Sequence, residues 1–118
     1  MHLHPHSIEL SSCHLGSVFY CLDCEMIQIE FSNLLVELQY EEFMKFKSFL
    51  TKSDFRKVEV ENKNLPYNRK LVWQFSQSTI KAVFHEKEAM ELLGLLIDAE
   101  HSLLKRSFVV NNCLFSMN

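Results

Sequence analysis

Three of the four cysteines of this chain lie close together near its start, in a stretch that could bind a metal ion or carry out thiol chemistry. Cys21 and Cys24 form a C-x-x-C pair, and Cys13 precedes them. A tight turn at C-x-x-C spacing brings two sulfurs within reach of one zinc ion, which in structural sites takes four thiolate or imidazole ligands in a tetrahedron. A zinc site therefore needs two ligands besides the pair.

The segment before the pair supplies candidates for these ligands. Cys13 returns to the pair if residues 14–20 form a small hairpin around Gly16. The predicted zinc ligands are then Cys13, His14, Cys21 and Cys24. Because adjacent residues seldom ligate one ion comfortably, His14 has alternatives as the fourth ligand, and these are His2, His4, His6 and Cys113.

The same cysteines have two other interpretations. A redox pair needs a thiolate stabilised at the start of a helix, whereas this pair precedes an alternating, strand-like segment. Asp23 and Glu25 are also expected to raise the pKa of both thiols, which disfavours redox chemistry. Free cysteines are, in addition, commonly buried as small apolar side chains. The sequence leaves these interpretations open.

The segment after the cysteines predicts a hairpin. Apolar residues alternate in residues 27–31 and again in residues 34–38, with Ser32 and Asn33 between them. These two residues suit a tight turn, in which Asn readily takes a positive φ. A slip of one residue in the pairing would move the apolar side chains of one strand to the opposite face of the sheet. The predicted pairs, all on one face, are Phe31 with Leu34, Ile29 with Val36, and Ile27 with Leu38.

Two other segments show the period of a helix. Phenylalanine and leucine at helical spacing predict a helix over about residues 40–52, and an apolar stripe predicts a longer one over residues 85–106. Acidic residues begin both segments and basic residues end them, as suits the helix dipole. Gly94 costs the longer helix about 1 kcal/mol relative to Ala. Close packing on the sheet is one reason for a glycine there.

The remaining segments alternate as strands do or lack a clear pattern. Residues 57–61 predict a short strand. In residues 71–84, a turn at Gln77 and Ser78 predicts a second hairpin. The tail at residues 107–118 adds an edge strand or lies loose. The apolar pairs of the second hairpin are Leu71 with Phe84, Trp73 with Ala82, and Phe75 with Ile80.

These elements predict one α+β domain over residues 1–118. Its element order is β-β-β-α-β-β-α, and two helices pack on one face of an antiparallel sheet of hairpins. The length fits a single domain. Residues 1–7 and 107–118 are its expected flexible ends.

Composition and charge disfavour several classes of function. The net charge is -3, whereas nucleic-acid binders usually have a basic face. The chain has only two glycines, too few for the usual phosphate-binding loops. No apolar stretch reaches the roughly 20 residues of a membrane helix, and the start does not resemble a secretory signal. We expect a cytoplasmic protein with reduced cysteines.

The expected function is a small non-enzymatic binding or regulatory domain with a structural zinc site. A cysteine-dependent redox protein or small enzyme is the alternative, and a metal-free interaction module is another. The expected partner is another protein or a second copy of the chain, not nucleic acid or a membrane.

The cysteines and the hairpin resemble a family of small uncharacterised bacterial proteins of about this length. Those proteins carry a cysteine, a glycine, a C-x-x-C and an F-G-N turn between two strands, followed by a helix. The likeness covers roughly residues 8–104. This chain departs from the pattern at Ser32, in place of Gly, and at Glu25, where Gly is common. The resemblance supports the α+β fold and the relevance of the cysteines, and it implies no activity.

A second resemblance points to a different fold. Residues 34–50 are similar to the opening helices of pyrin-type death-fold domains, which are adaptor modules. That fold would need helices where residues 57–61 and 71–75 alternate like strands, so it conflicts with the predicted α+β class.

Overall fold

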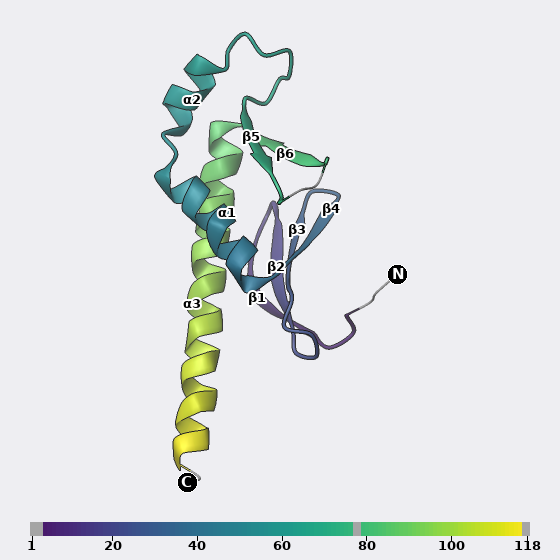
Figure 1. Ribbon diagram of the computed structural model, residues 1–118, viewed down its shortest axis with the longest axis vertical. Helices are drawn as coiled ribbons and strands as arrows, with labels where there is room; N and C mark the ends of the chain where they lie inside the picture. The colour runs from purple at the N-terminus through teal and green to yellow at the C-terminus, as the bar shows by residue number, and fades with distance from the viewer. Residues whose placement is uncertain (1–3, 77–78, 117–118) are drawn as a thin grey trace.

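The computed structural model describes the backbone of residues 4–76 and 79–116, and within these ranges the side chains up to Arg106. The described chain forms an α+β fold, which confirms the predicted class (Figure 1). Its elements are β1 (Ser7–Cys13), β2 (Gly16–Cys21), β3 (Ile27–Phe31), β4 (Leu34–Leu38), α1 (Tyr40–Lys52), α2 (Phe55–Glu61), β5 (Leu71–Gln74), β6 (Lys81–Phe84) and α3 (Glu86–Ser116).

The first four strands form an antiparallel sheet in the order β1-β2-β3-β4. The β3–β4 hairpin has the predicted register, with Phe31 opposite Leu34 and Ile27 opposite Leu38. The positive φ of its turn is at Ser32, at 56°, and not at Asn33 as the turn chemistry suggested. Because Leu34–Leu38 pairs only with β3, β4 is an edge strand.

The predicted hairpin around Gly16 joins β1 to β2, and Cys13 lies opposite Gly16. Gly16 also faces Phe31 of β3, and the backbones approach closely there. A Cβ atom on Gly16 would lie 1.8 Å from the carbonyl oxygen of Glu30. A glycine is therefore required at this point of the sheet.

Helices α1 and α3 pack on the sheet and share one hydrophobic core with it (Figure 1). The predicted face of α1, made of Phe43, Phe46 and Leu50, is buried. Helix α3 runs beyond the predicted residue 106 and includes the tail to Ser116, so the tail does not form an edge strand. Gly94 of α3 faces open space, so close packing is the wrong explanation for it.

The strand predicted at residues 57–61 is wrong, because this segment belongs to helix α2. The side chain of Asp54 caps the helix by accepting a hydrogen bond from the backbone N–H of Lys57 at 3.2 Å. Phe55 anchors it in the core, whereas Val60 is exposed. Alternation over five residues was too short to separate a strand from a short capped helix.

The second hairpin pairs as predicted, with Leu71 opposite Phe84 and Trp73 opposite Ala82. It forms its own two-stranded sheet and does not join the first. The Phe75–Ile80 pair lies beyond the paired strands, and the predicted turn at Gln77 and Ser78 lies outside the described residues. Strands at residues 34–38 and 71–74 also contradict a pyrin-type death fold.

Candidate metal centre

Three side chains that could hold a metal ion meet where the N-terminal segment crosses the loop between β2 and β3. They are His4, Cys21 and Cys24, and one ligand atom of each lies within 4.8 Å of the other two. The Nδ1 atom of His4 lies 3.3 Å from the Cys24 sulfur. Cys21 is buried and Cys24 is exposed, so the cluster lies at the rim of the protein.

The segment before β1 is held against the β2–β3 loop by the backbone as well as by side chains. The N–H of Leu22 donates to the carbonyl oxygen of His6 at 3.3 Å. The imidazole Nδ1 of His6 lies 2.6 Å from an Asp23 carboxylate oxygen. These contacts continue the β1–β2 pairing, in which Ser7 lies opposite Cys21, and they place His4 over the cysteine pair.

The loop itself is a tight turn that brings the two sulfurs together. The N–H of Glu25 donates to the carbonyl oxygen of Cys21 at 2.9 Å, and the N–H of Cys21 donates to that of Met26 at 2.9 Å. Glu25 has a positive φ of 62°, which closes the turn. The N–H of Cys24 points at the Cys21 sulfur at 3.4 Å. This geometry is what C-x-x-C spacing predicts for a pair that shares one ion.

Glu37 of β4 lies on the other side of the His4 ring from the sulfurs. Its carboxylate oxygen Oε2 lies 3.2 Å from Nε2 of the imidazole, whose side chain is only 3% exposed. If Nε2 carries the proton and donates it to Glu37, Nδ1 keeps its lone pair toward the sulfurs. Metal-binding histidines are commonly oriented in this way by a carboxylate on the other ring nitrogen.

The electrostatics of the cluster favour one thiolate. The Cys24 N–H, followed by the Cys24 thiol, lowers the pKa of Cys21 to about 7. The hydrogen bond to Cys21 raises the pKa of Cys24, because that thiol keeps its proton while its neighbour is ionised. Hydrogen bonding to Cys21, and then to Glu37, raises the pKa of His4.

These pKa shifts correct one expectation. Asp23 and Glu25 were expected to raise the pKa of both thiols, but the pKa of Cys21 is lowered. The backbone amides of the loop outweigh the acidic side chains, because they point at the sulfur. The carboxylates of Asp23 and Glu25 are exposed to solvent, which screens them.

The spacing of the three ligand atoms is compatible with one tetrahedral metal ion such as zinc. Bond lengths of about 2.3 Å to sulfur and about 2.0 Å to nitrogen separate the ligand atoms of a tetrahedral ion by roughly 3.5 to 3.8 Å. The 3.3 Å contact between His4 and Cys24 and the 4.8 Å limit for the group bracket these values. Two thiolates and one imidazole are also a soft donor set, which favours zinc over calcium or magnesium. Three protein ligands leave a tetrahedral ion one further position.

The structure brings together two of the four predicted ligands and places the other two elsewhere. Cys13 ends β1 opposite Gly16, at the far end of the hairpin from Cys21. Six residues of extended chain separate it from Ser7, which is roughly 20 Å. His14 lies beside Cys13, and its Nε2 atom pairs with Glu91 of α3 at 3.0 Å. Neither residue reaches the cluster.

His4, one of the alternative ligands, is the third residue of the cluster. His6 instead pairs with Asp23. His2 and the side chain of Cys113 lie outside the described residues. Glu37 was not predicted at all, because it appeared only as the polar position of an alternating strand. Its role follows from the β3–β4 register and the path of the N-terminal segment together.

The chain belongs to a family of unknown function, DUF6686, whose model matches residues 3–116. The match includes all three residues of the cluster. No curated protein and no solved structure matches the chain. Among the described helices, none is both long and apolar enough to cross a membrane.

Proposed function

We propose that this member of the family is a small non-enzymatic binding domain in which His4, Cys21 and Cys24 hold one zinc ion. The observation that carries the proposal is the convergence of one imidazole and two sulfurs within 4.8 Å. The ion would fasten the N-terminal segment to the β2–β3 loop. Its role would be structural, because it would add a covalent link to the backbone and side-chain contacts that already join these two segments.

The immediate surroundings support zinc in three ways. The Glu37 carboxylate lies 3.2 Å from Nε2 of His4, where it can pair with that side of the ring. The Cys24 N–H stabilises a thiolate at Cys21, whose pKa of about 7 means weak competition from protons near neutral pH. The loop already has the conformation that two thiolate ligands need. Such a site requires reduced thiols, so we place the protein in a reducing compartment such as the cytoplasm.

A redox pair is the second candidate, and the lowered pKa of Cys21 is the observation that favours it. In a dithiol catalyst the low-pKa thiolate must be accessible to its substrate. Here Cys21 is 1% exposed, whereas the accessible sulfur is that of Cys24, whose pKa is raised. A buried thiolate suits a metal ligand better than a nucleophile.

Metal analysis with matched variants tests the proposal. The full chain is purified without a histidine tag under reducing conditions, and its zinc content is measured. We expect close to one zinc per chain, and loss of zinc in His4→Ala, Cys21→Ser and Cys24→Ser. Cys13→Ser and His14→Ala change the same residue types at the far end of the β1–β2 hairpin, so they should keep the metal.

Two results would contradict the proposal. One is freshly reduced protein that takes up no near-stoichiometric zinc. The other is a loss of zinc in Cys13→Ser as large as that in Cys21→Ser, which would point to a different ligand set. Thiol alkylation rates against pH address the redox candidate. An accessible thiolate at Cys21 in metal-free protein would favour that candidate instead.

A further inference from the structure

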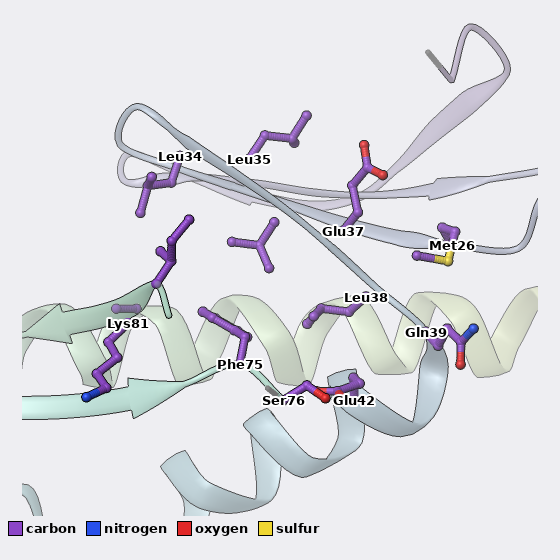
Figure 2. Close-up of a pocket in the computed structure, with 13 residues that line it drawn as sticks. Met26, Leu34, Leu35, Glu37, Leu38, Gln39, Glu42, Phe75, Ser76 and Lys81 are labelled. Atoms are coloured by element: carbon purple, nitrogen blue, oxygen red, sulfur yellow. The ribbon is translucent and has the colours of Figure 1, made fainter. Parts of the chain in front are cut away.

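A groove lies between the edge strand β4 and the β5–β6 hairpin, with the start of α1 as its floor (Figure 2). Its volume is about 470 Å³, within the range of about 300 to 1,000 Å³ that ligand sites usually have. Leu34 is 44% exposed and Leu35 56% exposed on the β4 wall, and Ile80 is 66% exposed on the other. The walls of the groove are thus mostly apolar and accessible.

The backbone of β4 offers unused hydrogen-bonding groups along this groove. A two-residue turn makes Phe31 and Leu34 a hydrogen-bonded pair, and such pairs then recur at every second residue. Leu34, Val36 and Leu38 therefore direct their N–H and C=O groups toward β3. Leu35 and Glu37 direct theirs away from the sheet, and no described residue accepts or donates there.

Beneath the groove is a smaller recess that is lined only by apolar side chains. It has a volume of about 20 Å³, and Leu34, Val36, Phe75 and Ala82 border both spaces. That volume is enough for the tip of one apolar side chain. In Figure 2, Leu38 and Phe75 lie on this inner side of β4, and Leu35 and Glu37 lie on the other side.

The two ends of the groove carry opposite charges. Lys81 lies at the end near Leu34, and Glu42 lies at the end near Leu38 and Gln39. Among the described residues, neither charged side chain forms an ion pair. An occupant antiparallel to β4 would bring its first residues to Glu42 and its last residues to Lys81.

We propose that this groove binds an extended peptide segment of a partner protein, which adds to the sheet as a strand beside β4. The outward N–H and C=O groups at alternate residues, which pair with no described residue, can recognise an extended backbone, and an apolar recess selects one side chain. The charges call for a segment that is basic at its first residues and acidic at its last. A second copy of the chain is the alternative occupant, and the concentration dependence of amide protection tests it.

A random octapeptide library displayed on phage, selected on the immobilised full chain, tests the proposal. We expect enriched peptides to alternate apolar residues and to run from basic to acidic. Synthetic copies should protect the amides of Leu35 and Glu37 from hydrogen exchange, while those of Leu34 and Val36 are already protected in the free chain. Reversing the order of charges in the peptide should weaken binding by about threefold to tenfold.

Two variants separate edge pairing from other modes of binding. Leu35→Pro removes an outward N–H and leaves the ladder to β3 intact, so binding should weaken by about tenfold or more. Lys81→Glu should favour peptides with a basic end in place of an acidic one. Tryptophan fluorescence from Trp73 reports whether each variant is folded. If Leu35→Pro does not fold, the hydrogen-exchange pattern of the unmodified chain shows whether the peptide pairs with the edge of β4.

Three outcomes would overturn the proposal. The first is a selection that enriches no sequence pattern, and the second is enriched peptides that bind folded Leu35→Pro as well as they bind the original chain. Protection of the Leu35 and Glu37 amides that rises with protein concentration, without peptide, would assign the edge to a second copy. None of these outcomes depends on whether zinc binds at His4, so the two proposals fail separately.

Discussion

Replacement of Glu37 tests the proposed metal centre at a residue that does not touch the ion. Its carboxylate lies 3.2 Å from Nε2 of His4, on the side of the ring that faces away from the sulfurs. In Glu37→Ala the imidazole loses this ion-pair partner, which lies across the ring from the contact between Nδ1 and the Cys24 sulfur. Removal of such an orienting partner typically lowers metal affinity by about 10- to 100-fold.

The exposure of the Glu37 carboxylate and of the His4 imidazole narrows the expected loss of metal affinity. The Glu37 side chain is 36% exposed, so solvent screens part of its charge, whereas the imidazole is only 3% exposed. Glu37→Gln keeps an oxygen that can accept from Nε2. We therefore expect a loss of about tenfold or less for Gln and a larger loss for Ala, within the range for orienting residues.

Competition with a chromophoric chelator at pH 7 measures the zinc affinity of each variant. Glu30→Ala is the matched control, because Glu30 lies on the neighbouring strand β3, on the same face as Glu37, and pairs with Leu35 in the ladder. A zinc affinity of Glu37→Ala within threefold of the original chain would refute the proposed orientation of His4. An equal loss in Glu30→Ala would show that the effect is a general one of surface charge.

The remaining predictions concern stability and are measured by urea unfolding with Trp73 fluorescence. Gly94→Ala should stabilise the chain by about 1 kcal/mol, because a Cβ there meets only open space. Gly16→Ala should cost about 3 kcal/mol or more, since its Cβ would overlap the Glu30 carbonyl oxygen. Ser32→Gly should stabilise by about 0.5 kcal/mol, because it relieves a positive φ. Arg69 lowers the pKa of Glu88 below its usual 4.5, so this pair should stabilise the fold above that pH and lose its effect as pH falls through the lower, folded value. Glu88→Gln should make the free energy of unfolding depend less on pH in this acidic range. An unchanged pH dependence would contradict a stabilising role of the Arg69–Glu88 pair.

The β3–β4 register was predictable because two independent signals agreed on it. A two-residue turn and a period-two pattern both placed Ile27, Ile29 and Phe31 on one face, and their partners followed. Helix α2 was not predictable in this way, since its identity depends on the Asp54 cap and on the burial of Phe55. Neither feature appears in the alternation of its valines.

The grouping of His4 with Cys21 and Cys24 was only partly predictable, although the predicted hairpin around Gly16 already indicated it. A tight turn before Gly16 pairs Cys13 with Gly16 and brings the residues before β1 to Cys21. A hairpin at this point therefore excludes Cys13 and favours an N-terminal histidine. What the sequence lacks is a local signal for the path of the first residues, because His4 is held by contacts with the distant Cys24 and Glu37.

Glu37 links the metal centre and the groove without making them compete. In a strand, the side chain stands roughly perpendicular to the sheet, while the backbone N–H and C=O lie in its plane. The carboxylate of Glu37 can therefore hold His4 on one face, while the amide of the same residue pairs with an added strand at the edge. Fixing the side chain also restrains the backbone of β4 next to the groove. A zinc ion at His4, Cys21 and Cys24 would in this way stiffen the edge that the proposed peptide uses, and zinc-loaded protein should bind the peptide at least as tightly as metal-free protein.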